Sequence, residues 1–490
     1  MPLPPGQNAR ALRSPLIDPD LGYIAGQWVG ADSGKTVAVI NPATGEHLAD
    51  VPNMGKDETL RAVSAGEQSL KAPTTIDQRR GWLLKIAQRL KDNKEELGRI
   101  ITLEHGKPWK EAQGEVEYAA GFFQYCGEHI DALKSHPLKE RPRNHDWTVH
   151  YRPAGVVALI TPWNFPIAML AKKLSAALAA DCASIAKPAS KTPLTMIAFF
   201  TLLAKLDLPA GKVNLLIGSP QTIGDVLCQH PSVRLISFTG STEVGRLLLH
   251  NTADYVKRLT LELGGNAPFI VFDDADLDAA ADHLMANKFR GSGQTCVCAN
   301  RVYVHRLVVD AFAQKLAQRV KKLKVGNGLE PDTDIGPLID ENAFKKVKRH
   351  VDDAIAKGAL RVVGEAPTSQ GEWGNFFPPT VLRNVTKEMA CVNEETFGPL
   401  VPLLEFETEA QAIERGNDTE YGLAAYVFTK DTARAQRVIR GLRFGHVGHN
   451  TGTGPAPEAP FGGMKQSGFG REGGREGLFE FVEPQTVPAL

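Results

Sequence analysis

From about residue 154 onward, short β-rich runs and helical segments alternate along this 490-residue chain. A short apolar run predicts a strand, and apolar residues that recur at helical spacing predict a helix. The expected strands are 156–160, 183–186, 213–217, 235–238 and 259–263, and the expected helices are 168–180, 194–206, 222–229 and 243–251. Such alternation favours a parallel sheet with crossover helices, so the predicted fold class is α/β.

The paired glycines Gly264 and Gly265 mark a boundary, because a second alternating series occupies 269–444. Ahead of the first series, helical periodicity covers 78–100 and again 111–133. The chain is therefore predicted to contain two α/β units in sequence, with helices before the first.

Two other segments are predicted to lie outside these units. The run 147–151 (WTVHY) alternates as a strand does and lies between polar, proline-rich ends. It is either an arm that pairs with another subunit or a surface hairpin. Residues 1–20 are proline-rich and are predicted to form an irregular arm.

Charge and hydropathy narrow the class of partner. The formal net charge is zero, which argues against a nucleic acid or an anionic membrane as the main partner. The most apolar stretch, 167–186, is interrupted by Lys172, Lys173 and Asp181, so no bilayer-spanning segment is expected. Six cysteines in so long a chain do not form a disulfide framework. A reducing, cytoplasmic setting is expected.

A candidate phosphate site lies in 238–245 (FTGSTEVG), where an apolar strand is followed by a helix. The first turn of a helix offers free N–H groups and a positive dipole end. Gly240 allows close approach of the backbone, and the Ser241 hydroxyl adds a donor. An ordinary helix start has the same composition, so both interpretations stay open.

A candidate nucleophile is Cys296, in a loop of small and polar residues, 293–298. A cysteine is a strong nucleophile once ionised. The alternative is an inert buried thiol. No second Cys or His pair accompanies Cys296 and Cys298 at suitable spacing, so no metal site is expected.

Two polar residues at strand ends complete the candidate chemistry. Glu262 lies among leucines within the apolar strand 259–263, where burial tends to raise the pKa of a carboxyl and suits it to act as a general base. A strand-edge glutamate facing water is the alternative. Asn164 follows strand 156–160, where its amide can donate to an oxyanion. A turn asparagine between two prolines is the alternative.

In order along the chain, seven motifs resemble those of the aldehyde dehydrogenase superfamily. They are TPWNFP (161–166), KPASKTP (187–193), FTGSTEVG (238–245), LELGGN (261–266), GQTC (293–296), EETFGP (394–399) and PFGG (460–463). The resemblance covers about residues 20 to 485. It implies a parallel-sheet cofactor domain (20–133 and 154–264), an α/β catalytic domain (265–458) and a β oligomerisation arm (134–153 and 470–490). It also implies a homodimer or homotetramer.

The resemblance also implies roles for single residues. Cys296 matches the nucleophile, its backbone N–H and the Asn164 side chain match the oxyanion hole, and Glu262 matches the base that activates water to hydrolyse a thioester. Lys187 matches a contact to the adenosine ribose, Ser241 one to the pyrophosphate, and Glu395 and Phe397 those to the nicotinamide ribose and ring. The implied cofactor contacts are Thr161, Trp163, Lys187, Ser190, Gly240, Ser241, Gly245, Leu263, Glu395 and Phe397.

Within the superfamily, Phe289-Arg290 and the following GQTCVCAN resemble the succinate-semialdehyde dehydrogenases. Arg290 matches an arginine that holds the distal carboxylate of the substrate, although a surface arginine is the alternative. The branch's second arginine is replaced by Lys172, and a serine before PFGG is replaced by Pro455. The substrate is therefore expected to be succinate semialdehyde or another ω-semialdehyde, such as that of glutarate or 2-oxoglutarate, with a broad range of aldehydes as the alternative. The implied substrate contacts are Arg290, Lys172, Phe165 and Phe461.

Two finer expectations follow from the same resemblance. NAD-preferring relatives commonly carry a glutamate at the position of Ser190, where it repels a 2′-phosphate. With Ser190 flanked by Lys187 and Lys191, NADP is expected to be accepted and preferred over NAD. Cys298 is either a partner for a reversible disulfide with Cys296 or a small packing residue.

Overall fold

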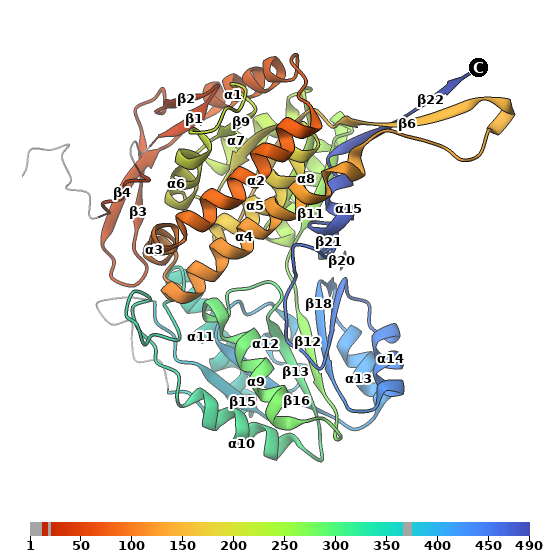
Figure 1. Cartoon of the computed structure of the whole chain (residues 1–490). Coiled ribbons are helices and arrows are strands. Elements are labelled where there is room, and N and C mark those ends of the chain that lie inside the picture. The colour runs from red at the N-terminus through yellow and green to blue at the C-terminus, as the bar shows by residue number, and fades with distance from the viewer. Residues whose placement is uncertain (1–11, 18–20, 366–374) are drawn as a thin grey trace, which may run out of the picture.

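The computed structural model describes residues 12–17, 21–365 and 375–490 (Figure 1). Of the predicted irregular arm, 1–20, the described part 12–17 contains no helix or strand, and the remainder lies outside the described residues. Two large sheets dominate the structure, one in each half of the molecule, and a narrow β arm projects from the first half.

The first sheet has the strand order β2-β1-β9-β8-β7-β10-β11-β21. Its five central strands are parallel: β9 (Val213–Leu215), β8 (Ala183–Lys187), β7 (Val156–Ile160), β10 (Val233–Thr239) and β11 (Arg258–Glu262). The edge strands are β1 (Gly22–Ile24), β2 (Gln27–Val29) and β21 (Gly468–Phe469). The predicted parallel sheet is confirmed, because every predicted strand is present with ends that differ by at most two residues.

Helices cover both faces of this sheet (Figure 1). One face packs on α1 (Lys56–Ser69), α7 (Pro220–Gln229) and α8 (Thr242–Thr252). The other face packs on α5 (Pro166–Ala179) and α6 (Leu194–Leu203), with α2 (Ile76–Asp92), α3 (Lys94–His105) and α4 (Trp109–His129) outside them. The four helices predicted between the strands are all present, and the stretch 111–133 is α4 followed by the 3-10 turn η1 (Ile130–Leu133).

The helical stretch predicted over 78–100 is divided into α2 and α3. Asn93 leaves the helical conformation at φ −111° and ψ 19°. Its side-chain amide donates to the carbonyl of Arg89 at 2.8 Å, which caps the end of α2. An asparagine offers the backbone this alternative to a continuous helix, and apolar periodicity alone does not reveal it.

The second sheet has the order β14-β15-β16-β13-β12-β18-β19. Its strands are β14 (Leu360–Val363), β15 (Thr380–Arg383), β16 (Leu400–Phe406), β13 (Ala299–His305), β12 (Ala267–Val271), β18 (Ala424–Phe428) and β19 (His446–His449), all parallel to their neighbours except β14. Its helices are α9 (Leu277–Lys288), α10 (Val309–Val320), α11 (Glu341–Ala356), α12 (Ala390–Asn393), α13 (Glu409–Asn417) and α14 (Thr432–Gly441). This sheet is the second alternating series of the sequence.

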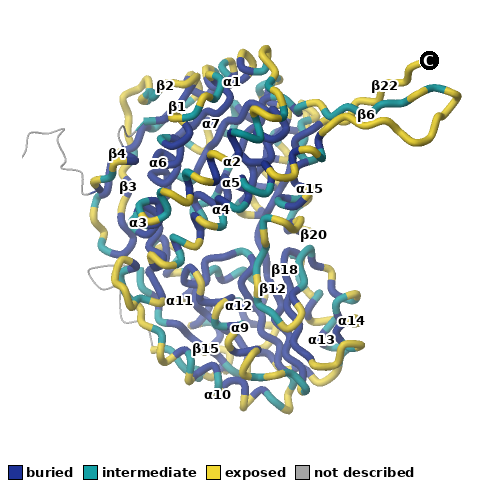
Figure 2. Tube along the Cα trace, in the orientation of Figure 1, coloured by how far each residue is buried: buried dark blue, intermediate teal, exposed yellow. Residues whose placement is uncertain are grey.

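The projecting arm is a three-stranded antiparallel sheet of order β22-β6-β5. Its strands are β22 (Val482–Ala489), β6 (Asp146–Pro153) and β5 (His136–Pro137), so the predicted strand 147–151 is confirmed. Most of the arm is solvent-exposed (Figure 2). Within the segment 470–490, α15 (Gly474–Phe479) packs against α4 and α5 instead of lying in the arm.

Shorter elements complete the fold. They are the hairpin β3 (Thr36–Ile40) and β4 (His47–Pro52), the pair β17 (Tyr421–Gly422) and β20 (Met464–Lys465), and the 3-10 turns η2 (Pro142–Asn144), η3 (Ala253–Tyr255) and η4 (Arg290–Gly293). Across the described ranges, no helix combines the length and the apolar character that crossing a bilayer requires.

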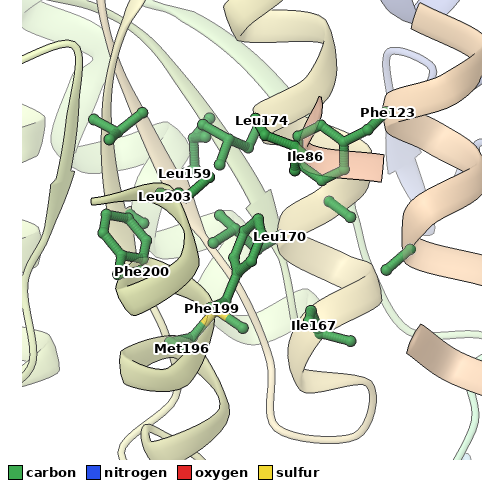
Figure 3. Packing of buried hydrophobic residues seen from close by; sticks show 14 of the residues in the cluster. Ile86, Phe123, Leu159, Ile167, Leu170, Leu174, Met196, Phe199, Phe200 and Leu203 are labelled. Atoms are coloured by element: carbon green, nitrogen blue, oxygen red, sulfur yellow. The ribbon is translucent and has the colours of Figure 1, made fainter. Parts of the chain in front are cut away.

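The hydrophobic core around α5 holds this helix in place behind the carboxyl ends of the parallel strands. Side chains from α2, α4, β7, α5 and α6 pack together there, including Ile86, Phe123, Leu159, Leu170 and Phe199 (Figure 3). Fully burying each such side chain contributes about 1.5–3 kcal/mol. Every residue of α5 is buried, including its lysines. A buried ammonium group needs a compensating partner, so the groups around these lysines must offset the cost of burying their charges.

Candidate active site

The candidate site lies where the carboxyl ends of the first sheet face the loop before β13 of the second. Two cavities meet there, and Cys296 and Met169 line both of them. Ligands in α/β proteins bind at this end of a parallel sheet. The two cavities give one reacting residue access to two different ligands.

The loop that carries Cys296 is tightly constrained. Gly291, Ser292 and Gly293 all have positive φ, at 57°, 60° and 75°. A Cβ added to Gly265 would lie 2.5 Å from the carbonyl oxygen of Cys296, so a glycine is needed for strand β11 and this loop to approach so closely. Cys296 is therefore held against the end of β11, where Glu262 lies.

The Cys296 thiol is in an environment that opposes ionisation. Burial raises its pKa to about 12, and the positive charge of Lys172 is the main influence in the opposite direction. Among the described residues, the Cys296 backbone N–H donates to no acceptor. That N–H is free to donate to a developing oxyanion.

Asn164 provides a second donor at the same point. Its Nδ2 donates to the carbonyl oxygen of Gln294 at 2.9 Å, which places the amide beside the loop of Cys296. An amide nitrogen carries two hydrogens, so one remains for a ligand. Its Oδ1 is buried without a hydrogen-bond partner in the described structure.

Glu262 ends β11 and is 5% exposed. Neither carboxyl oxygen has a hydrogen-bond partner among the described residues. Burial, followed by the nearby carboxylate of Glu472, raises the pKa of Glu262 well above its ordinary value, while Lys172 and Lys173 act in the opposite direction. A carboxyl with a raised pKa is suited to general-base chemistry near neutral pH.

Three buried lysines surround these residues. Lys107 donates to Glu115 and to the carbonyl oxygen of Asn164, both at 2.7 Å. Lys173 donates to Glu472 at 2.5 Å and to Ser237 at 2.9 Å. Lys172 has its Nζ 3.8 Å from the other oxygen of Glu472.

The first cavity has a volume of about 350 Å³ and contains all four of the predicted substrate contacts, Arg290, Lys172, Phe165 and Phe461. The Arg290 guanidinium lies 5.3 Å from the centre of the Phe165 ring. Arg290 is exposed and makes no ion pair with any residue in the described part of the chain. Burial raises the pKa of Glu111, which lines the same cavity, and the charge of Arg290 is among the influences in the opposite direction. The sequence did not reveal Lys107, Glu111, Glu115 and Tyr118 as further lining residues.

The second cavity, of about 390 Å³, contains six of the ten predicted cofactor contacts. These are Trp163, Gly240, Ser241, Leu263, Glu395 and Phe397. The structure also places Lys191, Asp340 and Lys346 there, of which the last two come from the second α/β unit and carried no local signal. The Trp163 and Phe397 rings meet edge to face, with centroids 5.6 Å apart.

The other four predicted cofactor contacts do not line that cavity. Thr161 and Lys187 are neighbours at the ends of β7 and β8, where the Thr161 N–H donates to the Lys187 carbonyl oxygen at 3.1 Å. Gly245 lies on α8 against the side chain of Leu263. Ser190 occupies the turn after β8. Their proposed contacts with a cofactor remain predictions.

Several features of this region fit a cofactor that carries phosphate. Ser241 caps α8 by accepting from the Val244 N–H at 3.3 Å, so the N-terminus of that helix opens into the cavity. Burial lowers the pKa of Lys187 to about 8, and within the described ranges its ammonium donates only to the Pro188 carbonyl oxygen, at 3.0 Å. Burial also raises the pKa of Glu395 to about 7, although one of its oxygens accepts from the Gly265 N–H at 3.1 Å.

Cys298, two residues after Cys296, is buried. Its thiol donates to the Gly293 carbonyl oxygen at 3.3 Å, and Lys288 approaches its sulfur at 3.6 Å. Both Cys296 and Cys298 are free thiols. The predicted disulfide between them stays a prediction.

Comparison with known proteins places this arrangement among relatives of similar length. The profile of the aldehyde dehydrogenase family matches residues 28–487. A glutarate-semialdehyde dehydrogenase of Pseudomonas putida is 47% identical and covers 94% of this chain and 96% of its own. A succinate-semialdehyde dehydrogenase of Escherichia coli, named for NADP(+), is 46% identical, with 94% and 95% coverage. The crystal structure of an oxidoreductase from Marinobacter aquaeolei is 63% identical, with a TM-score of 0.96 over 98% of this chain and 100% of that one.

Proposed function

The chain belongs to the aldehyde dehydrogenase family, and from that membership we propose that it oxidises a semialdehyde with a distal carboxylate, such as succinate semialdehyde, to the dicarboxylic acid. The overall reaction consumes one aldehyde, one water and one NAD(P)+, and it yields the acid, NAD(P)H and a proton. The observation that carries the choice of substrate is Arg290, which lines the first cavity and forms no ion pair with any described residue.

Cys296 performs the first half of the reaction. Its thiolate adds to the aldehyde carbon, and the carbonyl oxygen becomes an oxyanion. The Cys296 N–H and the free hydrogen of the Asn164 amide are placed to donate to that oxygen. A bound nicotinamide supplies the acceptor for the hydride, and the carbon is left as a thioester on Cys296.

Glu262 performs the second half. A water molecule must lose a proton to attack the thioester. Glu262 lies beside the Cys296 loop, and neither of its oxygens has a hydrogen-bond partner among the residues that the structure describes. Its raised pKa makes it a stronger base than an exposed glutamate. The proton passes to Glu262, the C–S bond breaks, and the acid leaves the first cavity.

NADP is the cofactor that we propose to be preferred, with NAD as the alternative. Ser190 carries no negative charge to repel a 2′-phosphate. Lys187 ends β8 and Lys191 lies in the turn that follows it, where it also pairs with Asp340. The relative from Escherichia coli is named for NADP(+). A tenfold or larger advantage in kcat/KM for NAD would contradict the proposal.

The decisive experiment for the substrate is kcat/KM for succinate semialdehyde against butyraldehyde, each with NADP. A preference of a hundredfold or more corresponds to about 3 kcal/mol of differential binding, as a charged anchor supplies. Arg290→Met should reduce that preference at least tenfold, and Arg290→Lys should retain part of it. Glutarate semialdehyde should be measured in the same assay, because one relative is named as a glutarate-semialdehyde dehydrogenase. Equal rates for the charged and neutral aldehydes would identify a broad-specificity enzyme instead.

We also propose that the chain forms a homodimer or homotetramer through its arm. Among the described strands, β22 pairs with β6 alone, so its other edge is open to a further strand. Unpaired sheet edges are templates for pairing with another chain. Light scattering should give a mass of two or four times 53.2 kDa, and removal of residues 482–490 should reduce it.

A further inference from the structure

The ammonium group of Lys172 occupies an unusual position on the wall of the first cavity. It is on α5, is 4% exposed, and lies 4.8 Å from the centre of the Phe461 ring. The rings of Phe122 and Tyr118, on α4, are 5.8 and 5.9 Å away. Aromatic faces attract a cation, but they do not neutralise it.

The only carboxylate within ion-pair distance of Lys172 in the described structure is already engaged. Glu472 accepts from Lys173 at 2.5 Å through Oε1, whereas Lys172 is 3.8 Å from Oε2 and beyond hydrogen-bonding distance. That Oε2 has no hydrogen-bond partner. Two buried ammonium groups therefore share one carboxylate.

The charges in this cluster leave room for one more anion. Lys172 and Lys173 contribute two positive charges, and Glu472 contributes one negative charge. Glu262, whose pKa is raised, retains its proton more readily than an ordinary glutamate. The remaining acids that face Lys172 in the same cavity are the Tyr118 hydroxyl and the Cys296 thiol, and of these two the thiol is the group that ionises in the proposed reaction.

We propose that Lys172 is the counter-ion of the Cys296 thiolate and not an anchor for the substrate carboxylate. When the S–H bond of Cys296 breaks, its proton leaves to water in the cavity, and the resulting negative charge balances the excess positive charge of the Lys172, Lys173 and Glu472 cluster. When the sulfur is later held in a thioester, the same excess stabilises the Glu262 carboxylate. Lys172 thus acts through other residues, as a positioning charge.

Several charged or titratable groups face the two residues, and Lys107, Glu111, Glu115 and Arg290 line the same cavity. Lys172 is faced by Tyr118, Glu472, Cys296 and Glu262, and Cys296 is faced in addition by Glu395 and Cys298. The charges that surround Glu262 are those of Glu472, Lys172, Lys173 and Arg471. Of the cations in this set, Lys172 is the one with the largest effect on the thiol. It follows that Arg290, at the cavity wall, is left as the anchor for the substrate.

This inference rests on the proposed reaction at Cys296, but its test needs neither substrate nor cofactor. The rate of alkylation by iodoacetamide follows the thiolate fraction, and Cys296 is the cysteine that is not buried. The rate would be measured from pH 6 to 10 on the full-length protein, with mass spectrometry of the Cys296 peptide as the readout. Below the pKa of the thiol, each unit by which that pKa rises slows alkylation tenfold.

The expected result is that Lys172→Met slows alkylation of Cys296 about tenfold at pH 8 and shifts the whole curve to higher pH. Lys172→Arg, which keeps the charge, should retain the original profile, and Arg290→Met is the matched control that should leave it unchanged. If Lys172→Met fails to fold, Lys172→Gln tests the same loss of charge. An alkylation profile unchanged in the neutral variants, or shifted equally by Arg290→Met, would overturn the inference.

Kinetics separate this inference from the proposed function. If Lys172→Met instead raises KM for succinate semialdehyde, leaves KM for butyraldehyde unchanged and leaves alkylation unchanged, Lys172 is a carboxylate anchor and the inference is wrong. If the alkylation shift appears but the protein shows no preference for carboxylated aldehydes, the inference stands and the proposed substrate is wrong.

Discussion

Lys107 and Lys172 line the same cavity, and both are almost completely buried, but their charges are compensated differently. Lys107 is in a closed network. Its partner Glu115 accepts from Lys107 through one oxygen and from the N–H groups of Ile167 and Ala168 through the other, at 2.7, 3.0 and 3.2 Å. Lys172 has no hydrogen bond in the described structure and only a shared carboxylate at 3.8 Å.

The difference shows that a buried lysine can have either a structural or an electrostatic role at this site. The closed network ties the first turn of α5 to α4 and holds the Asn164 carbonyl oxygen, so it fixes the geometry of the oxyanion donor. The charge of Lys172 is not fully compensated by its surroundings, so it can stabilise a negative charge that forms in the site during the reaction. A fully paired ion stabilises one arrangement, whereas an incompletely paired one favours the ionised form of a neighbour.

The largest expected effect comes from opening the closed network. Lys107→Met leaves Glu115 buried without its counter-ion, and breaking such a pair costs about 3–5 kcal/mol. Thermal unfolding of the full chain should show a Tm lower by roughly 3–5 °C. Lys172→Met should have little effect on Tm, because Glu472 retains Lys173.

A double variant provides the control for this prediction. Lys107→Met combined with Glu115→Gln removes both charges and keeps an oxygen that accepts from Ile167 and Ala168, so it should recover most of the lost stability. If Lys172→Met lowered Tm as much as Lys107→Met, both lysines would have to be regarded as structural and the distinction between them would be lost.

The same contrast shows how far the sequence can predict this site. Cys296, Glu262 and Asn164 each lie in a short motif next to a strand end, so local sequence identifies them and the alternating pattern brings their strands to one edge. The alternation predicted the parallel sheet because apolar runs and helical periodicity are local signals.

The charge network had no such local signal. Lys107 and the Asn164 carbonyl oxygen are 57 positions apart, and Lys173 and Glu472 are 299 apart. Glu472 lies in the glycine-rich segment 468–473 and precedes α15, where nothing marks it as a partner of α5. Which buried lysine is paired depends on the packing of distant segments, and composition cannot supply it.

An intermediate effect is expected on the pH dependence of deacylation. Glu262 must be deprotonated to accept a proton from water, so the rate falls as pH decreases through its pKa, which is already above the ordinary value. Removal of a nearby positive charge raises the pKa of a carboxyl further. Lys172→Met should therefore move the acidic limb upward by about one pH unit, which is about 1.4 kcal/mol.

p-Nitrophenyl acetate isolates this step, because it acylates a thiol without a hydride acceptor. After an initial burst, its steady hydrolysis reports deacylation. The double variant of Lys107 and Glu115 should keep the limb at its original pH, since its charges are compensated within their own network. A limb that moved in both variants would mean that the pKa of Glu262 responds to any change in the fold.

The smallest expected effect concerns Lys187. Of the buried lysines compared, it is the least compensated, because no carboxylate pairs with it in the described structure. Its pKa is lowered to about 8, so its ammonium is charged at pH 7 and loses its proton as pH rises through 8. If it binds the cofactor in the charged form, the affinity for NADPH should fall about fourfold between pH 7 and 8.5, as the charged fraction falls. Fluorescence titration of NADPH at both pH values measures this.

Lys187→Met should bind NADPH more weakly at pH 7 and lose the difference in affinity between the two pH values, whereas Lys172→Met should retain that difference. An affinity independent of pH in the unaltered protein would show that the Lys187 charge does not contact the cofactor, and that a buried lysine without a carboxylate partner can also be purely structural.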